Sequence, residues 1–481
     1  MSQISQPEDE PLDVVIMAAG KGTRMKSSMP KVLHRLGGRA LVAHVVDTAA
    51  RIGARHVVVV TGHGAADVEA ALETAMPGAA PQFARQVPQL GTGHAIQQAA
   101  PLLPDDGTVV VLSGDVPLIG DATLHALVAQ SAGRRLALLT IRVADPKGYG
   151  RIVRVPGAPG SGDDEGEVQS IVEEKDATPA QREITEIYSG VMAVPARLLK
   201  TWLARLDNKN AQGEYYLTDI VGFATIDGVP VVGLRTEDPL QVTGVNTPAQ
   251  LAALERAWQL RQAEALMEQG VRLADPARFD LRGTLVCEAD VEIDVNCVFE
   301  GAVSLGAGVR VGAHCVIANA RIETGTVIHP FTHIDGEEAG VTVGAGSRIG
   351  PFARLRPGAR LGTEVHIGNF VEVKNSTLAA GAKANHLAYL GDATVGQRVN
   401  YGAGSITANY DGANKHRTII GDDVHVGSNC VLVAPVTIGA GGTIGGGSTV
   451  TKSTAPGTLT ISRARQVSFT NWQRPQKAPK A

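Results

Sequence analysis

The sequence is poor in aromatic residues and has no paired cysteines. Phe, Trp and Tyr together make up 4% of the 481 residues. The four cysteines (Cys287, Cys297, Cys315 and Cys430) have no C-x-x-C spacing, so they predict neither a zinc site nor a redox pair. The chain also begins without the pattern of a secretory signal peptide. We therefore expect free thiols and a cytoplasmic location, where thiols stay reduced.

The sequence also lacks a net positive charge and a long apolar run, and each absence excludes one class of partner. The formal net charge is −4, so there is no general basic field of the kind that attracts nucleic acid. No apolar run approaches the ~20 residues that a membrane-spanning helix needs. We expect neither a nucleic-acid partner nor membrane insertion.

Glycine, by contrast, is abundant. Its 56 residues are about 12% of the chain, against a usual ~7%. High glycine with few aromatics favours an architecture built from tight, repeated turns, and the length suits two or three domains. Met1–Pro11 and residues 473–481 are predicted to be disordered tails, and the Gly/Pro/Asp-rich segment Pro156–Glu167 is predicted to be a surface hairpin extension.

Up to about residue 247, short apolar runs alternate with helical patterns. The apolar runs are His56–Gly62, Thr108–Asp115 and Leu136–Val143, and the helical patterns include Ala65–Ala75 and Ala122–Gln130. This alternation predicts an α/β domain with a mostly parallel sheet that helices cover on both faces. Ligands bind such sheets beyond the C-terminal strand ends, where Ala18–Arg24 and Asp115 are expected.

The stretch Val14–His34 (VVIMAAGKGTRMKSSMPKVLH) carries the strongest functional signal. A loop of small residues follows the apolar run, and it contains the cations Lys21 and Arg24. Small residues let backbone N–H groups approach a phosphate, and cations neutralise its charge. Pro30-Lys31 is predicted to open a helix and to add a cation near its anion-binding N-terminus. The pattern is neither G-x-G-x-x-G nor G-x-x-x-x-G-K-[ST], which argues against a dinucleotide-binding domain and a Walker-type ATPase.

A connecting helix is expected after this domain. Thr247-Pro248-Ala249-Gln250 has the signature of a helix N-terminus, with Thr as the cap, Pro at the first helical position and Gln reaching back. Gly270 is the predicted stop.

Past residue 285 a branched aliphatic residue followed by glycine recurs every six residues, as in Val343-Gly344 and Ile349-Gly350. This period predicts a β-solenoid with three short strands in each coil. The repeats alone fit an inert scaffold equally well. The period is interrupted at Asn385–Asp392 and again at Thr407–His416, and long insertions in a solenoid usually carry function.

These motifs resemble two known families. Ala18–Met25 followed by Pro30-Lys31 resembles the signature of sugar-1-phosphate nucleotidylyltransferases, and the hexapeptide repeats resemble the left-handed parallel β-helix of acyltransferases. Further motifs are RQVPQLGTGHA (85–95), GYGRI (148–152), VEEKDA (172–177), NKNAQGEYYLTD (208–219) and GVN (244–246). Together they extend the resemblance over about residues 12–472, to the family of bifunctional uridyltransferase–acetyltransferases of UDP-N-acetylglucosamine synthesis.

The resemblance implies an architecture and two reactions. A Rossmann-like uridyltransferase domain is expected at 12–247, a helical linker at 248–270 and a left-handed β-helix acetyltransferase domain at 271–472, in a homotrimer with shared sites. The C-terminal domain would transfer acetyl from acetyl-CoA to glucosamine-1-phosphate. The N-terminal domain would then transfer uridylyl from UTP to N-acetylglucosamine-1-phosphate with Mg²⁺. The product would feed peptidoglycan and lipopolysaccharide synthesis.

The resemblance also implies site residues, carried over position by position. Those of the first domain are Met17, Ala18, Ala19, Gly20, Arg24, Lys31, Gln86, Gln89, Gly91, Thr92, Ser113, Gly114, Asp115, Gly150, Glu173, Tyr188 and Asn246, with Asp115 and Asn246 as the Mg²⁺ ligands. Those of the second are the general base His386, the sugar-phosphate residues Arg356, Lys374, Tyr389 and Asn400, and the acetyl-CoA residues Ala403, Asn409, Tyr410, Ser428, Gly446 and Arg463.

The chain departs from the family pattern at a few positions. Tyr188-Ser189-Gly190 stands where the family has Asn-Thr/Ser-Gly, so a ring replaces a compact amide beside the sugar. Ser113 and Gly446 are smaller departures, since small residues fit at both.

Two rival interpretations remain. A nucleotidylyltransferase with a β-helix used only for assembly or allostery gives no reason for Arg356, Lys374 and His386 to coexist. A non-catalytic trimeric scaffold predicts the loss of Asp115 or Lys31, and both are present. The residues favour the bifunctional enzyme.

Overall fold

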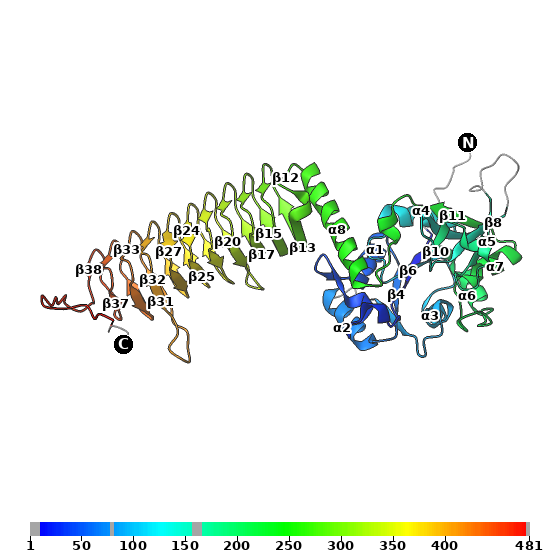
Figure 1. Ribbon diagram of the computed structural model, residues 1–481, viewed down its shortest axis with the longest axis horizontal. Coiled ribbons are helices and arrows are strands. Elements are labelled where there is room, and N and C mark those ends of the chain that lie inside the picture. Colours follow the sequence, from blue (N-terminus) through cyan, green and yellow to red (C-terminus); the bar gives the residue numbers. More distant parts are fainter. Residues whose placement is uncertain (1–9, 77–80, 156–165, 478–481) are drawn as a thin grey trace, which may run out of the picture. The chain divides into compact units, whose positions relative to one another are not determined.

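A computed structural model describes residues 10–76, 81–155 and 166–477 (Figure 1). Most of the predicted Pro156–Glu167 extension and most of the N-terminal tail lie outside these ranges, as do the last four residues. The chain divides into two compact units, the first ending at Trp258 and the second beginning at Gln259.

The first unit is built on a nine-stranded sheet with the main strand order β11-β7-β10-β6-β1-β4-β5. These strands are β1 (Leu12–Met17), β4 (His56–Thr61), β5 (Gln82–Arg85), β6 (Thr108–Ser113), β7 (Leu136–Arg142), β10 (Glu186–Pro195) and β11 (Val231–Arg235); β8 (Arg151–Arg154) and β9 (Val168–Val172) pair off this path. β10 runs antiparallel to β6 and β7, and the other pairs along the path are parallel. The predicted mostly parallel sheet is confirmed.

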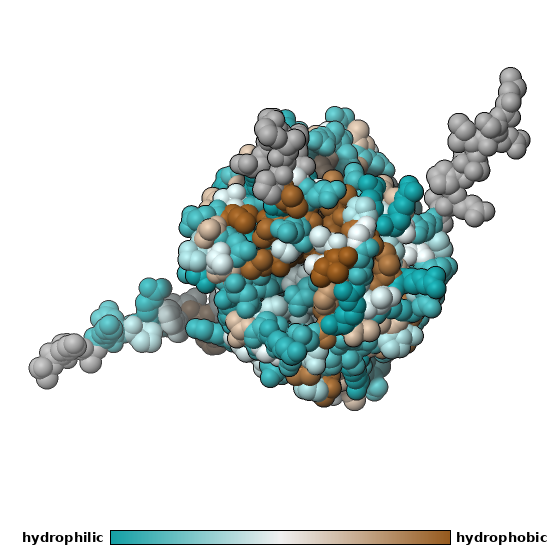
Figure 2. Space-filling view, turned by 90° about the vertical axis from the view of Figure 1, so that its right-hand side faces the viewer, coloured by the Kyte–Doolittle hydropathy of each residue, from teal (hydrophilic) through white to brown (hydrophobic). Residues whose placement is uncertain are grey.

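Helices cover both faces of this sheet, as predicted. α1 (Leu41–Arg51), α2 (Ala65–Ala75) and α4 (Asp121–Ser131) contribute to the core of one face. α3 (Thr92–Ala99), α6 (Ala196–Leu203) and α7 (Asp219–Ile226) contribute to the core of the other. Successive side chains of β1 alternate between the two cores, with Val15 in one and Val14 and Ile16 in the other, because strand residues point to opposite faces. Figure 2 shows one face of this unit, with hydrophobic and hydrophilic residues interspersed on its surface.

One predicted helix is wrong. Pro30-Lys31 opens only a turn of 3₁₀ helix, η2 (Lys31–Leu33), and not a longer helix. His34 is extended, and the chain then forms the hairpin of β2 (Arg35–Leu36) and β3 (Arg39–Ala40), with Gly37 and Gly38 at positive φ. The glycine pair turns the chain back before a second helical turn can form. The cation Lys31 is therefore presented from a short turn.

α8 (Pro248–Glu268) begins and ends near the predicted residues. Thr247 Oγ1 accepts the Gln250 N–H at 3.2 Å, while Gln250 Oε1 accepts the Asn246 N–H at 2.9 Å. The Gln250 side chain thus binds the backbone N–H of Asn246, the residue before the cap, and fixes the backbone there. Gly270 follows the helix at a φ of +97°. None of the helices in the described part of the chain combines the length and the hydropathy of a membrane span.

The second unit is a left-handed parallel β-helix, as predicted; its coils follow one another from β12 to β38 (Figure 1). One column of strands comprises β12 (Arg272–Leu273), β14 (Glu292–Ile293), β16 (Arg310–Val311), β18 (Val327–Ile328), β21 (Arg348–Ile349), β24 (His366–Asn369), β27 (Lys383–His386), β30 (Asn400–Tyr401), β33 (His425–Val426), β36 (Thr443–Ile444) and β38 (Leu459–Thr460). A second column comprises β19 (His333–Asp335), β22 (Arg354–Leu355), β25 (Glu372–Lys374), β28 (Tyr389–Gly391), β31 (Ile406–Ala408), β34 (Val431–Val433) and β37 (Thr449–Val450). The third column comprises β20 (Val341–Val343), β23 (Arg360–Leu361), β26 (Thr377–Leu378), β29 (Ala393–Val395), β32 (Thr418–Ile420) and β35 (Val436–Ile438). At the start of the β-helix, three longer strands each span the second and third columns: β13 (Phe279–Cys287), β15 (Cys297–Leu305) and β17 (Val316–Ile322).

The aliphatic-Gly pattern follows from this coiling. The aliphatic residues point inward, and Ile328, Ile349 and Ile367 are each at most 1% exposed. The following glycines pass close to the next coil: a Cβ on Gly306 would lie 2.6 Å from the Thr324 backbone nitrogen. A side chain there would separate the coils.

The strand register corrects one predicted interruption. Arg348 pairs with His366, and His366 pairs in turn with Lys383, so β27 and β28 continue the columns through Asn385–Asp392. The second of these two steps along the chain is one residue shorter than the first. The corner at Asn375 contains one residue fewer than the same corner of the previous coil, and the strands on either side still pair. The shorter corner disturbs the period of the sequence but leaves the coil intact. The second interruption is a true insertion, because the step from Asn400 to its partner His425 is much longer than either.

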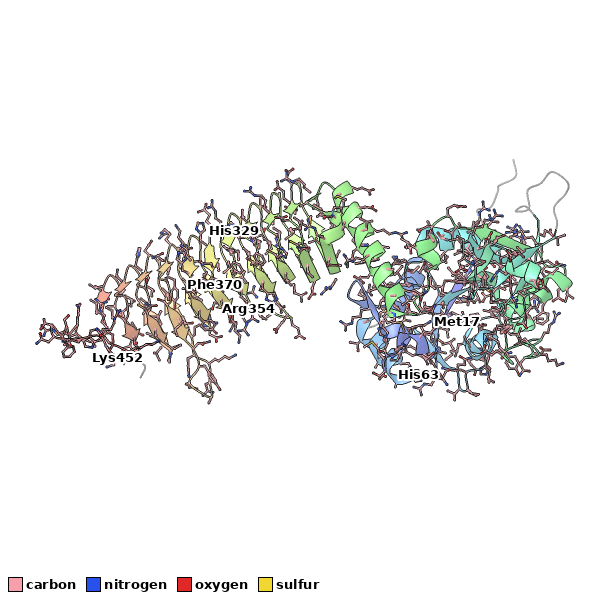
Figure 3. All side chains as sticks on the ribbon, viewed as in Figure 1. Met17, His63, His329, Arg354, Phe370 and Lys452 are labelled. Atoms are coloured by element: carbon pink, nitrogen blue, oxygen red, sulfur yellow. The ribbon has the colours of Figure 1, made fainter. Side chains whose placement is uncertain are left out.

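An aromatic column runs along one corner of the second unit. The rings of His314, Phe331, Phe352 and Phe370 stack in turn, with centroids 4.9, 5.0 and 5.4 Å apart. Figure 3 labels Phe370 in this row of coils. Stacked rings on successive coils hold this corner in a fixed conformation.

Candidate active sites

The first candidate site lies at the C-terminal ends of β1 and β6. The Ala18 N–H donates to Val60 O and the Gly114 N–H to Met17 O, both at 2.9 Å, so the loops leave the sheet in a fixed register. Gly22 has a φ of +59°, and a Cβ there would lie 2.6 Å from Lys31 Cβ, so the loop needs glycine to pass this side chain. Met17, labelled in Figure 3, marks the end of β1.

A pocket of about 590 Å³ opens beside this loop. It is lined by Met17, Ala18, Ala19, Gly20, Lys21, Gly22, Thr23, Lys31, Val32, Gln86, Gln89, Gly91, Thr92, Ala95, Ser113, Asp115 and Glu214. Most of the predicted nucleotide residues therefore meet around one cavity. No atom lies within 4 Å of a Cβ built on Gly20, which leaves open space against its backbone.

Cationic and oxygen-bearing side chains converge at the edge of this pocket. The Lys31 ammonium pairs with Asp115 Oδ2 and donates to Asn246 Oδ1 at 3.1 Å. Arg24 donates to the same Asn246 oxygen at 3.0 Å, and Ser113 Oγ donates to Asp115 Oδ1 at 2.7 Å. The structure thus brings together residues from opposite ends of the first unit's sequence.

The oxygen atoms of Asp115 and Asn246 suit a divalent metal ion. The described residues hold no cluster of three or more His, Cys, Asp or Glu side chains placed to bind a metal. The oxygens of Asp115 and Asn246 nevertheless both contact one cation, the Lys31 ammonium, so the two side chains face the same point. One carboxylate and one amide oxygen suit Mg²⁺, which completes its shell with phosphate and water oxygens.

The predicted base-reading loop closes the other side of the pocket. Gln86 is 4% exposed, and its Nε2 donates to Gly91 O at 2.9 Å. Gln89 Nε2 donates to Ala19 O, which ties this loop to the end of β1. Gly91 caps α3 at a φ of +110°, and Thr92 Oγ1 accepts the Leu217 N–H at 3.0 Å. The amide donors fasten the loop, which leaves the carbonyl oxygens to accept from a ligand N–H.

Three of the predicted sugar residues, Gly150, Glu173 and Tyr188, lie close together on neighbouring segments. The Tyr188 N–H donates to Gly150 O at 2.9 Å, and Glu173 Oε1 accepts from Thr218 Oγ1 at 3.0 Å. Burial raises the pKa of Glu173, and Asp176 and Glu214 add to the effect. Burial also raises the pKa of Tyr188, and its hydroxyl has no hydrogen-bond partner within the described chain. A buried hydroxyl without a partner is unfavourable unless a ligand or water satisfies it.

The second candidate site lies on the β-helix, where cations gather at the corner after β25. Arg356 pairs with Glu372 at 2.8 Å, and Lys374 ends β25. Lys415 lies beside Lys374. This neighbouring ammonium, followed by lost hydration and then Arg356, lowers the pKa of Lys374. Cations pressed together in this way lower their mutual repulsion by binding an anion.

Lys415 and Asp392 are functional candidates that the sequence reasoning missed. Lys415 belongs to the insertion, which is a hairpin closed by a Tyr410–Lys415 bridge. Asp392 is 7% exposed and accepts hydrogen bonds from Asn375 Nδ2 and Asn409 Nδ2. Two features of the sequence could have pointed to Lys415 and Asp392: the missing residue at Asn375 and the length of the insertion. Neither feature shows which side chains meet.

His386 lies at a different corner, at the end of β27. Its Nδ1 is 2.9 Å from Asn369 Oδ1 on β24. Ala403, Ser428 and Gly446 follow His386 in the same position of the next three coils: Gly404 N donates to His386 O, Asn429 N to Ala403 O and Gly447 N to Ser428 O. The predicted base and three of the predicted acetyl-CoA residues therefore form one column.

The remaining predicted residues flank these groups. Tyr389 begins β28, which runs from the His386 corner to the cation corner. Asn400 lies on β30 in register with Lys383, so within one chain it is on the column of His386 and apart from Arg356 and Lys374. Tyr410 is 62% exposed on the insertion, and Arg463 donates to Gly446 O at 2.7 Å.

The chain matches family models in both units. Residues 14–179 match a MobA-like NTP transferase domain, and residues 340–375 and 417–452 match the bacterial transferase hexapeptide (six repeats). Relatives named "Bifunctional protein GlmU" match nearly the whole chain. That of Albidiferax ferrireducens is 71% identical over 97% of this chain and 100% of its own length. That of Polaromonas sp. strain JS666 is 72% identical over 98% and 99%, and that of Azoarcus sp. strain BH72 is 54% identical over 97% and 100%.

Family membership rests on both the geometry and these relatives. A nucleotidyltransferase unit and a hexapeptide β-helix occur here in the same order and over the same length as in the relatives. The chain therefore belongs to the bifunctional GlmU family of nucleotidyltransferase–acetyltransferases.

Proposed function

We propose that the chain carries out two consecutive steps of UDP-N-acetylglucosamine synthesis. The β-helix transfers acetyl from acetyl-CoA to the amine of glucosamine-1-phosphate. The N-terminal unit then transfers uridylyl from UTP to N-acetylglucosamine-1-phosphate and releases pyrophosphate. The product feeds peptidoglycan and lipopolysaccharide synthesis. Membership of the GlmU family supports both activities and the need for a divalent metal in the nucleotidyltransferase unit.

In the uridyltransferase site, the chain positions two phosphates for in-line attack. The Ala18–Arg24 loop and the turn carrying Lys31 hold the triphosphate, and Gln86 and Gln89 read the base. Gly150, Glu173, Tyr188 and Asn246 line the place for the sugar. When bound, Mg²⁺ on Asp115 and Asn246 would neutralise charge shared by the phosphates. Lys31 stabilises the spread charge, and no protein nucleophile is needed.

In the acetyltransferase site, the column of Ala403, Ser428 and Gly446 holds acetyl-CoA with its thioester toward His386. Neutral imidazole accepts a proton from the substrate amine as the amine attacks the thioester carbonyl. Arg356, Lys374 and Lys415 bind the sugar phosphate. These contacts place the amine within reach of the thioester.

His386 lies at one corner of the β-helix and the cation cluster at another, which supports a site shared between two copies of the chain. Within one chain β28 separates the His386 column from the cation cluster, and Asn400 lies on the former side. A neighbouring copy would then supply part of each site. We propose a homotrimer, in which three β-helices form three equivalent sites.

The observation that carries this proposal is the meeting of Arg356, Lys374 and Lys415 at one corner of a scaffold whose next corner holds His386. An inert solenoid has no reason to press three cations together. The test is direct assay of the purified full-length chain. We expect thiol release from acetyl-CoA with glucosamine-1-phosphate and pyrophosphate release from UTP with N-acetylglucosamine-1-phosphate. Pyrophosphate release without thiol release would contradict the acetyltransferase assignment.

A further inference from the structure

Asn369 contacts the imidazole ring of His386, and this contact bears on which ring nitrogen carries the proton. Asn369 and His386 are direct partners in the register of β24 and β27, and the Leu387 N–H also donates to Asn369 O at 3.0 Å. The side chains meet at 2.9 Å between Asn369 Oδ1 and His386 Nδ1. With the amide oxygen facing the ring, as in the structure, the oxygen accepts the hydrogen bond and Nδ1 carries the imidazole proton.

From this contact we propose that Asn369 is a positioning residue that holds His386 in the Nδ1–H tautomer and leaves Nε2 as the proton acceptor. The inference rests on the proposed role of His386 as general base. During acetyl transfer, the amine nitrogen forms the new C–N bond and gives its proton to Nε2. The C–S bond then breaks, and the coenzyme A thiolate takes that proton back from the imidazolium. A ring protonated at Nε2 instead would present a donor to the amine and could not begin this sequence.

The corner that carries Asn369 is well suited to this task. Asn369 ends β24, and the next residue, Phe370, stacks on Phe352 in the aromatic column. This stack and the Leu387 N–H bond fix the backbone on both sides of the amide. The orientation of the imidazole is then set before substrate binds, which avoids reorganisation during the reaction.

Within the described residues, the strands packed against His386 carry a small set of titratable groups. On the same sheet, β24 carries His366 and β27 carries Lys383, and these two side chains are register partners at the other end of the strands. Across the corner β28 begins with Tyr389, and on the next coil β30 presents Asn400 and the buried Tyr401. Because Asn369 is neutral, it orients the imidazole and adds no charge that would stabilise its protonated form.

The experiment compares Asn369→Leu and Asn369→Asp in the full-length chain. Leucine removes the acceptor at similar volume, so we expect kcat of acetyl transfer to fall about 10–100-fold, the range found for residues that orient a histidine. KM for acetyl-CoA should stay within about twofold of the wild-type value, since the column that binds it is unchanged. Aspartate restores the acceptor and adds a negative charge, which stabilises the imidazolium. We expect it to retain most of kcat and to move the acid limb of the pH profile to higher pH.

Asn296→Gly is the control, because Asn296 contacts His314 in an Asn–His pair elsewhere on the β-helix and its φ of +58° suits glycine. It should leave both activities unchanged. Uridylyl transfer should be normal in every variant because its site lies in the other unit, and an unchanged thermal unfolding transition shows that the β-helix is folded. Wild-type acetylation with an unmoved acid limb in both Asn369 variants would overturn the inference. If Asn369→Leu fails to fold, the shift in Asn369→Asp decides alone. Near-normal acetylation by His386→Ala would instead overturn the proposed general base.

Discussion

Replacing Asp115 by asparagine removes one negative charge from the uridyltransferase site at almost constant shape. Both side chains of the Lys31–Asp115 pair are 14% exposed, at the edge of a wide pocket. Asparagine keeps one acceptor oxygen for Lys31, and its amide N–H can donate to Ser113 Oγ once that hydroxyl rotates; Lys31 also keeps its bond to Asn246. We expect the free energy of unfolding to fall by at most about 1 kcal/mol, because the pocket stays hydrated.

The effect on catalysis should be far larger. A metal ion that bridges phosphates supplies several kcal/mol of transition-state stabilisation, and about 1.4 kcal/mol corresponds to a factor of ten in rate. If the lost carboxylate accounts for about 3–4 kcal/mol of this, kcat for uridylyl transfer should fall about 10²–10³-fold. The Mg²⁺ concentration needed for half-maximal rate should rise as well. Acetyl transfer, which uses the other unit, should be unchanged.

The assay is pyrophosphate release over a Mg²⁺ titration, with thiol release measured on the same sample. Asp121→Asn is the matched control, since Asp121 forms an exposed pair with Arg51 on the same unit. It should leave both rates unchanged. A uridylyl rate within threefold of wild type in Asp115→Asn would refute the metal-ligand assignment, and a parallel loss of both activities would refute the separation of the sites.

Three further results are expected. Tyr188→Phe deletes the unpartnered hydroxyl, so thermal stability should hold or rise while KM for N-acetylglucosamine-1-phosphate increases; an unchanged KM would mean that the hydroxyl does not meet the sugar. Lys415→Met should raise KM for glucosamine-1-phosphate about tenfold with little change in KM for acetyl-CoA, and a change confined to acetyl-CoA would contradict the phosphate site. Burial, followed by Asp207, Glu173 and Asp176, raises the pKa of Asp219 to about 6, so its ionisation destabilises the fold as the pH rises from about 4 to about 6. Asp219→Asn should therefore be more stable to urea than wild type at pH 8 by about 1 kcal/mol, with the gap closing near pH 4; an equal gap at both pH values would contradict this cause.

The sequence was informative wherever one local pattern determines one element. Buried apolar runs predicted β4, β6 and β7 within one or two residues, and the helical pattern at Ala65–Ala75 matches α2. The Thr247 cap and the Gly270 stop placed α8 because capping depends on a few adjacent residues. The six-residue period predicted the β-helix for the same reason.

The prediction was wrong where a local pattern competed with the next segment. Pro30-Lys31 favours a helix, but the chain becomes extended at His34 and continues into the β2–β3 hairpin, whose turn is Gly37-Gly38. Asn385–Asp392 disturbs the period but not the coil, because the corner at Asp392 is as short as the Asn375 corner of the previous coil and the strands on either side stay in register. Periodicity along one chain cannot report pairing between coils.

Contacts between distant segments were also out of reach of the sequence. Lys415 is separated from Lys374 by more than two coils of the β-helix, on an insertion whose shape depends on Asp411. The Asp411 carboxylate accepts from the Ala413 and Asn414 N–H groups and pairs with His416 at 2.7 Å. Nothing in the order of residues places that hairpin beside Lys374. The hydrogen bond from His386 to Asn369 depends likewise on the exact length of the coil that joins them.

One chain holds two transferase sites with separate chemistry. The most direct test measures both half-reactions in one preparation of full-length His386→Ala. A positioned proton acceptor usually contributes about 10²–10⁴-fold, so acetyl transfer should fall by that factor while uridylyl transfer stays at the wild-type rate. Acetylation at a near-normal rate, or an equal fall in both activities in a folded protein, would contradict the account.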